Sequence, residues 1–410
     1  MIRSRIAPLV LCAVALLTTG CPPADGGKTD DGDYSIIVGG DGVFSPDYVK
    51  LAEGAAEGSY IITPYINDTS SPGIKAFSEA FIAEYKQEPD AWAALTYDAV
   101  GTIAVAIEKA GKPDRKGIRD ALAAMNSKET GYPGVTGVTF FDKNGDCAKP
   151  ALIAEVKGGK LTKSATQIDT SSAGEAKAGG DKAAKKAEGE PIVIGVAGPF
   201  TGGGQKYGEM IKAGAKLKLA ELNAAGGVLG RPLKIVWGDD ESTNSKAVNV
   251  ANDFAARPEL CAVVGHFNST CSLAAKAIYK AAEIPALTPG STNVKVCEGS
   301  DWYFRNLYRD DFQGFICSDF ITKSLKKKTC VVFFDDDDYG TGLKTFFEQR
   351  AKETGLEVLE SISYDKKSVT EFTSLVTKAK SKAPEVIFIA GNYKEAALIA
   401  KACKKAGLTK

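Results

Sequence analysis

The sequence predicts an α/β fold built from parallel sheets. Short apolar runs alternate with longer amphipathic segments, which is the pattern of βαβ units. The chain has 410 residues, of which 44% are hydrophobic and 25% are charged, an ordinary balance for a globular protein. A chain of this length can form two or three domains, each with its own core.

The second half of the chain carries the clearer alternation. The apolar runs predict strands at residues 192–196, 233–237, 261–265, 286–287, 303–307, 330–334, 358–361 and 386–390. The amphipathic segments predict helices at residues 206–225, 245–256, 272–282 and 395–406. Gly226 and Gly227 end the first of these helices.

The first half begins in the middle of the same pattern. Strands are predicted at residues 35–38, 60–63, 138–141 and 151–156, and helices at 74–85, 91–110 and 116–125. Between the halves, residues 171–190 contain only Ala, Gly, Lys, Glu, Asp and Ser, so 166–190 is predicted to be a flexible linker. The first part begins in the middle of the strand–helix pattern, and the second part ends on a helix. This suggests that the two parts belong to one fold whose chain has been cut and rejoined at another point.

The start of the chain resembles an export signal. Arg3 and Arg5 precede an apolar run at residues 6–17, so residues 1–20 are predicted to be a signal peptide. The cysteine after Gly20 makes this segment similar to a bacterial lipoprotein signal, in which Cys21 is lipidated, although Thr18 stands where that signal usually has Leu. The alternative is plain secretion with cleavage elsewhere. Residues 21–33 are then a tether, and the chain is periplasmic or at the cell surface, anchored through Cys21.

Composition excludes several classes of function. Lys plus Arg and Asp plus Glu both number 51, so no basic excess exists to bind nucleic acid. His266 is the only histidine, and without a nucleophile–base–acid set we expect no enzyme, no metal and no cofactor. The Gly-rich turn at 201–204 lacks the pattern of a phosphate-binding loop. Seven cysteines remain after Cys12 and Cys21, an odd number that leaves at least one thiol unpaired within the chain.

An ordered set of short motifs resembles the branched-chain amino-acid (Leu/Ile/Val) binding proteins of ABC importers, which have the type I periplasmic binding protein fold. In the second half the motifs are residues 223–233, 239–240, 265–270, 288–292, 339–340 and 391–393. In the first half, residues 40–42, 55–58, 97–100, 134–137 and 142–146 resemble the C-terminal half of that family. The halves therefore stand in reversed order, which we interpret as a circular permutation with residues 33 and 410 close in space.

The resemblance implies two doubly wound parallel-sheet lobes around a hinge. Lobe 1 is expected at about 65–142 plus 191–310, and lobe 2 at about 34–64 plus 143–165 plus 311–410. Two other interpretations of the reversed order are halves that complete each other only between molecules, and a truncated tandem gene.

The same resemblance implies an amino-acid site beyond the carboxyl ends of the strands. Ser269 and Thr270 are expected to bind the α-carboxylate at a helix N-terminus, with help from the Thr292 hydroxyl. Asp41 is expected to pair with the α-ammonium, where many relatives carry Glu, and the Gly290 carbonyl and Tyr393 are expected to contribute. Taken alone, a turn aspartate and a capping serine are common structural features.

The side chain of the ligand is expected to meet aromatic residues. The candidates are Tyr207, Phe267, Tyr339 and Trp92. The predicted function is that of a lipid-anchored monomer that binds an amino acid or similar small zwitterion and delivers it to an ABC permease in the membrane. The alternative is a sensor of the same fold that signals to a membrane partner.

Overall fold

The computed structural model describes residues 34–168 and 187–410. The predicted signal peptide, Cys21, the tether and most of the predicted linker lie outside these ranges. Both described ends of the linker make hydrogen bonds: the Gln167 side chain donates to the carbonyl of Ile153, and the Glu188 backbone nitrogen donates to Gly230. Within the described ranges, no helix has the length and hydropathy needed to cross a membrane.

A five-stranded sheet, here called the small sheet, is wholly parallel, in the order β11-β10-β9-β7-β8. Its strands are β7 (Ile192–Gly198), β8 (Leu233–Asp239), β9 (Leu260–Val264), β10 (Ala286–Thr288) and β11 (Tyr303–Arg305). Alternate side chains of β9 point to opposite faces. Ala262 and Val264 belong to a core with α3 (Ala91–Ala110) and α5 (Gln205–Ala224), whereas Val263 packs with α6 (Asn244–Ala255) and α7 (Ser269–Ala281). This arrangement is doubly wound, as the sequence predicts.

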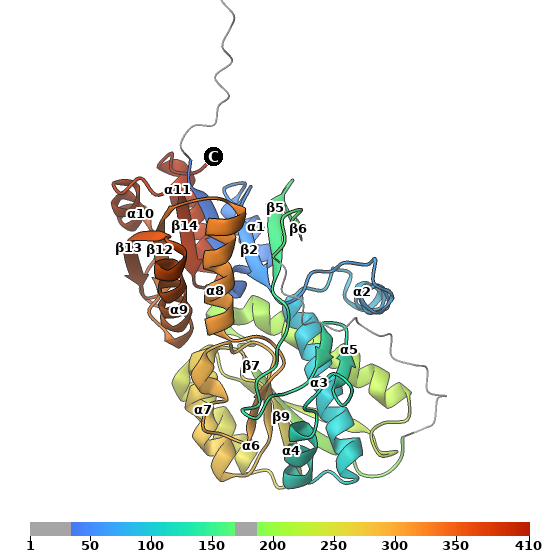
Figure 1. The fold of residues 1–410 in the computed structure, drawn as a ribbon. Coiled ribbons are helices and arrows are strands. Elements are labelled where there is room, and N and C mark those ends of the chain that lie inside the picture. The colour runs from blue at the N-terminus through green and yellow to red at the C-terminus, as the bar shows by residue number, and fades with distance from the viewer. Residues whose placement is uncertain (1–33, 169–186) are drawn as a thin grey trace, which may run out of the picture. The chain divides into compact units, whose positions relative to one another are not determined.

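A seven-stranded sheet, here called the large sheet, runs in the order β13-β12-β14-β1-β2-β5-β6. Its strands are β1 (Ile36–Gly39), β2 (Tyr60–Thr63), β5 (Leu152–Lys157), β6 (Lys160–Lys163), β12 (Thr329–Asp335), β13 (Glu357–Tyr364) and β14 (Val386–Ala390). Helices α8 (Asp310–Asp319) and α9 (Asp338–Thr354) lie side by side over one face (Figure 1). Helices α1 (Pro46–Ala52), α10 (Thr373–Lys380) and α11 (Tyr393–Lys405) cover the other face.

One edge of the large sheet departs from the predicted parallel pattern. Strands β5 and β6 are antiparallel to each other, and β5 is antiparallel to β2. Gly158 and Gly159, both with positive φ, make the tight turn between them. Two residues can join only antiparallel strands, because a parallel connection needs a longer crossover.

The remaining elements are α2 (Pro72–Tyr85), α4 (Arg115–Ala123) and a hairpin of β3 (Tyr132–Gly134) and β4 (Gly137–Thr139). Strands β2 and β14 and helix α3 have the predicted bounds. Helix α7 begins three residues before the predicted start, because its polar first turn carries no apolar periodicity. The lobe boundaries stay a prediction. The seven cysteines that follow Cys21 are all buried free thiols.

Candidate functional site

The predicted site residues all follow the carboxyl ends of parallel strands, where ligands bind in open α/β sheets. In the small sheet, Tyr207 follows β7, while Phe267, Ser269 and Thr270 follow β9, and Gly290 and Thr292 follow β10. In the large sheet, Tyr339 follows β12, Tyr393 follows β14 and Asp41 follows β1.

Asp41 lies in a short 3₁₀ turn directly after β1, with only 2% of its surface exposed. Its Oδ1 accepts a hydrogen bond from the Tyr339 hydroxyl at 2.9 Å, and the same hydroxyl accepts from the Gly42 nitrogen at 3.0 Å. Its Oδ2 has no hydrogen-bond partner among the described residues. Burial raises the pKa of Asp41 from 3.8 to about 6, although the nearby polar side chains of Gln313 and Tyr339 lower it.

A second buried carboxylate, Asp310, lies beside Asp41 at the first residue of α8. Burial raises its pKa well above the ordinary range, and the nearby charge of Asp41 raises it further, while the neighbouring Thr292 hydroxyl lowers it. Within the described ranges, neither carboxylate oxygen of Asp310 nor the Thr292 hydroxyl makes a hydrogen bond of ordinary geometry. Unpaired buried acceptors are rare because each one costs desolvation free energy.

Asp310 was not predicted from the sequence. Asp310 follows the carboxyl end of strand β11, and Asp41 was selected because it follows the carboxyl end of a strand, so the same criterion also applied to Asp310. However, acidic residues are common in the first turn of any helix, where they interact favourably with the helix dipole, and Asp311 stands next to it. Only the three-dimensional contacts separate the two aspartates: Asp311 pairs with Arg309, whereas Asp310 is buried.

The loop that carries Thr292 is held from behind by Arg305, which is fully buried. The guanidinium donates to the carbonyl oxygens of Ser291 and Asn293 at 3.0 and 2.9 Å. Its charge is balanced by Asp146, whose Oδ1 lies 2.6 Å from Nε. Because two nitrogens of a rigid guanidinium hold the loop on either side of Thr292, the position of the Thr292 hydroxyl is fixed.

Ser269 and Thr270 form the first turn of α7. The preceding residue, Asn268, makes no side-chain capping bond to this turn. The Ser269 hydroxyl accepts a hydrogen bond from the Asn293 nitrogen at 3.2 Å, and each hydroxyl can still donate one proton. Thr270 Oγ1 accepts from the Asp338 nitrogen at 3.3 Å, and Asn293 Nδ2 donates to the Asp338 carbonyl at 2.7 Å. The loops beyond the two sheets therefore touch at this point.

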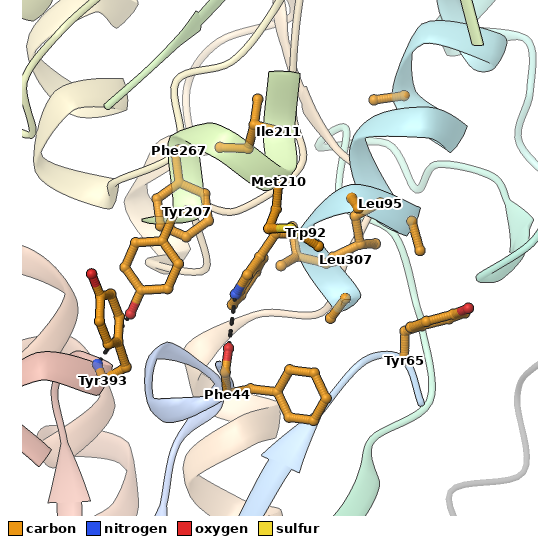
Figure 2. Close-up of a cluster of buried hydrophobic side chains, with 14 of the residues drawn as sticks. Phe44, Tyr65, Trp92, Leu95, Tyr207, Met210, Ile211, Phe267, Leu307 and Tyr393 are labelled. Atoms are coloured by element: carbon orange, nitrogen blue, oxygen red, sulfur yellow. Dashed lines mark hydrogen bonds between the residues drawn. The ribbon is translucent and has the colours of Figure 1, made fainter. Parts of the chain in front are cut away.

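The predicted aromatic residues pack against one another (Figure 2). Tyr207 and Phe267 lie with ring centroids 4.6 Å apart, and Trp92 meets Phe267 edge to face at 4.9 Å. The Tyr207 hydroxyl donates to the Gly42 carbonyl and accepts from the Tyr393 nitrogen at 3.2 Å. Tyr339 does not belong to this group, because its hydroxyl bonds to Asp41.

Gly290 has a structural reason to be glycine. A Cβ built at this position would lie 2.3 Å from Cδ2 of Phe267. The missing side chain therefore makes room for the Phe267 ring. The predicted approach of a ligand to the Gly290 carbonyl stays a prediction.

A cavity of about 340 Å³ adjoins these residues. Tyr207 and Tyr393 line it, together with Asn268, the residue before Ser269. A neighbouring cavity of about 490 Å³ is lined by Thr270 and by the acidic run at 335–338. A larger one, of about 930 Å³, lies between Phe44, Tyr65 and Met210, and none of the predicted site residues lines it.

His266 has a carboxylate partner that the sequence did not reveal. Its Nδ1 lies 2.7 Å from Oδ2 of Asp240, and its Nε2 lies 2.9 Å from the Tyr279 hydroxyl. All three side chains are fully buried. The carbonyl of His266 accepts hydrogen bonds from Ser272, Thr288 and Ser291. His266 therefore ties the loops after β8, β9 and β10 together.

Comparison with known proteins adds independent evidence. The chain is 39% identical to an "Amino acid binding protein" of Pseudomonas aeruginosa, and 32% identical to "Leu/Ile/Val-binding protein homolog 2" of Brucella abortus. Each match covers 53% of this chain and 58% of the relative, so the chain spans less than two thirds of these relatives. Both relatives are named as binding proteins and neither as an enzyme.

Among solved structures, the chain is similar to the branched-chain amino acid transporter substrate binding protein LivJ of Streptococcus pneumoniae in complex with isoleucine. The identity is 30%, the TM-score is 0.51, and the match covers 54% of this chain and 63% of LivJ. The leucine binding protein LivK of Thermotoga maritima matches with 32% identity and a TM-score of 0.50, over 53% of this chain and 61% of LivK.

The sequence profile of one family matches most of the chain, at residues 28–160 and 191–410. The parallel sheets, the doubly wound order and the loops at the strand ends agree with that match. The chain belongs to the periplasmic binding protein family.

Proposed function

We propose that this protein is the extracytoplasmic substrate-binding lipoprotein of an ABC importer, and that it binds an amino acid between the loops of the two sheets. The names of its relatives support the importer context. Binding of a zwitterion needs an anionic group for the ammonium and a donor group for the carboxylate. Both kinds of group stand at the candidate site.

The observation that carries the proposal is the group of unpaired acceptors at Asp41, Asp310 and Thr292. Asp41 Oδ2, both carboxylate oxygens of Asp310 and the Thr292 hydroxyl are buried, and none of them makes a hydrogen bond of ordinary geometry to a described residue. A primary ammonium has three N–H donors and a positive charge, so it satisfies such acceptors directly. Bound there, it offsets the desolvation of both carboxylates.

The other end of the ligand is assigned to the first turn of α7. The backbone N–H groups of a first turn have no partners within their helix and carry part of the helix dipole. Ser269 and Thr270 add two hydroxyl donors at the same place. An α-carboxylate fits this combination of donors and partial positive charge.

The proposal includes the circular permutation, which the strand order supports. In the small sheet, the second strand along the chain lies outermost, followed in space by the first, third, fourth and fifth. Strands β13, β12, β14, β1 and β2 repeat that order only if β1 and β2 are counted after β14. The Ser35 nitrogen also donates to the Leu408 carbonyl at 2.8 Å, which places the described residues nearest 33 and 410 side by side. Asp33 itself lies outside the described ranges.

The lipid anchor at Cys21 is also part of the proposal. Metabolic labelling with a radioactive fatty acid in a bacterial host should mark the wild-type chain and leave a Cys21→Ala variant unlabelled. Label that persists in the variant would place lipidation at another residue, and a wild-type chain without label would refute the anchor.

Ligand binding is tested by a thermal-shift screen of the full chain against the twenty amino acids, with isothermal titration calorimetry of every hit. A ligand at 100 times its Kd should stabilise the fold by about 2.7 kcal/mol, a shift of a few degrees. Asp41→Asn and Asp310→Asn should each lose that shift. Asp253→Asn, an exposed change in α6, should keep it. A folded protein that no amino acid stabilises would overturn the proposal.

A further inference from the structure

The cavity beside Tyr207 differs from a site for an aliphatic side chain. It is lined by residues 203–204, 207, 241–243, 268, 366–367 and 392–395. These residues include glycines, hydroxyl and amide side chains, lysines and glutamates, while Tyr207 and Tyr393 supply the rings. No Val, Leu, Ile or Met side chain is among the described residues that line it. A branched-chain side chain placed there would lie against polar groups and would gain little from burial.

Two residues that line the cavity connect it to the two ends of the proposed amino-acid site. Its Tyr207 hydroxyl bonds to Gly42, the residue after Asp41, which is assigned to the ammonium. Its Asn268 directly precedes Ser269, which is assigned to the carboxylate. For an amino acid held between Asp41 and Ser269, we assign the side chain to this cavity, because these two connections lead from both ends of the site to it.

Two of the charged side chains around the cavity are lysines that make no ion pair within the described ranges. Lys367 and Lys394 are both exposed, and neither makes an ion pair with another described residue. Lys366 is already paired with Asp335 and Asp337, and Glu241 lies 3.2 Å from Lys246. Glu395 is buried, which raises the pKa of its carboxyl group. Apart from these paired or buried groups, the charged side chains that line the cavity are the two lysines.

Two helices also begin at this cavity. Helix α5 starts after Gly203 and Gly204, and α11 starts at Tyr393. Neither helix has a side-chain capping bond at its first turn. The partial positive charge of these two ends adds to that of Lys367 and Lys394. An anion is favoured by both contributions.

We propose that the natural ligand is an amino acid with a carboxylate on its side chain, bound with that carboxylate in the cavity formed by Tyr207, Tyr393, Lys367 and Lys394. This inference rests on the proposed function and concerns only the ligand class. The expected ligand then differs from the leucine, isoleucine and valine that the names of some relatives specify.

The test compares three ligands with side chains of nearly equal size: L-aspartate, L-asparagine and L-leucine. Calorimetry on the full chain at low ionic strength should give the tightest binding for aspartate and the weakest for leucine. Lys367→Met and Lys394→Met should each weaken aspartate binding about threefold and leave leucine binding unchanged, since exposed charge pairs contribute modestly. Added salt should weaken aspartate binding in the wild type.

Controls separate this inference from the proposed function. Lys216→Met, an exposed change on α5 away from the cavity, should bind aspartate as the wild type does. Asp41→Asn should lose all three ligands. Leucine binding that equals or exceeds aspartate binding, or aspartate binding unaffected by both lysine changes, would overturn the inference and leave the amino-acid function standing. A folded chain that binds no amino acid would overturn both.

Discussion

The hydroxyl of Tyr339 lies 2.9 Å from Oδ1 of Asp41, although the two residues are 298 positions apart in the chain. The contact joins the first turn of α9 to the turn after β1, so two distant segments of the chain hold one buried carboxylate. The same hydroxyl accepts a hydrogen bond from the Gly42 backbone nitrogen. Tyr339 therefore sets both the position of Asp41 and the course of the backbone after it.

Tyr339→Phe should destabilise the fold by about 1–2 kcal/mol, because it leaves the Gly42 nitrogen and one Asp41 oxygen without a partner. Urea denaturation measures this change. Tyr85→Phe, at a half-buried tyrosine on α2, is the matched control and should have little effect. Equal effects of the two changes would show that the Tyr339 hydroxyl adds nothing to the stability.

The raised pKa of Asp41 predicts a pH dependence of stability. The folded state holds the Asp41 proton up to about pH 6, whereas the unfolded chain releases it near pH 4. The stabilisation of the folded state that comes from this bound proton is therefore fully present below about pH 4 and is lost as the pH rises through 6. Asp41→Asn removes it, so the variant should gain stability relative to the wild type between pH 4 and 7, by up to about 3 kcal/mol.

Unfolding in urea at pH 4, 5, 6 and 7 measures that difference. Asp90 and Asp335, whose carboxyl groups are also buried with raised pKa values, are present in both proteins and cancel in the comparison. A wild-type minus variant difference that stays constant over this range would show that Asp41 has an ordinary pKa.

The Asp240–His266–Tyr279 contacts predict graded losses of stability. Asp240→Ala should cost about 3 kcal/mol, since it removes the partner of a buried imidazole and leaves a polar nitrogen unpaired. Tyr279→Phe removes only one hydroxyl and should cost about 1 kcal/mol. Chemical denaturation of both variants checks the order, and a larger loss in Tyr279→Phe would contradict it.

Gly391 and Tyr364 predict a compensating pair. A Cβ at position 391 would lie 1.9 Å from the Tyr364 hydroxyl, so Gly391→Ala should destabilise the fold by about 1–3 kcal/mol. The Tyr364 hydroxyl has no hydrogen-bond partner within the described ranges, so Tyr364→Phe alone should be almost neutral. The double variant should recover much of the stability that Gly391→Ala loses. If the effects of the two changes simply add, the clash between a Cβ at position 391 and the Tyr364 hydroxyl is excluded.

The permutation predicts that the two halves can be exchanged. A chain in which residues 191–410 precede residues 34–168, joined by a short Gly-Ser linker from 410 to 34, should fold and melt within a few degrees of the natural chain. Circular dichroism and calorimetry compare the two. An exchanged chain that does not fold would refute the proposed order.

Regular elements with strong apolar patterns were predictable from the sequence. Strand β14 and helix α3 have the predicted bounds because their patterns are continuous and end at turn residues. Strand β5 was predicted without its antiparallel direction, since a short strand carries no signal of direction, and strand β6 was not predicted at all. Placement of the site residues at strand ends also followed from the sequence.

The composition of the site did not follow from the sequence. Asp310 resembles any acidic residue at a helix start until its burial beside Asp41 is known. The partner of His266 lies 26 residues away, at the end of a different strand, and such pairings depend on how strands are ordered in the sheet. The polar lining of the cavity comes from several loops that only the fold brings together.

The order of the large sheet has a consequence for how this chain folds during synthesis and export. Strand β1 leaves the ribosome early, yet one of its two neighbours, β14, spans residues 386–390 near the other end. Until that last strand is available, β1 presents an unpaired edge, which invites pairing with other chains. The large sheet can therefore close only after synthesis is nearly complete, and until then the pairing of β1 with β14 competes with pairing between different chains.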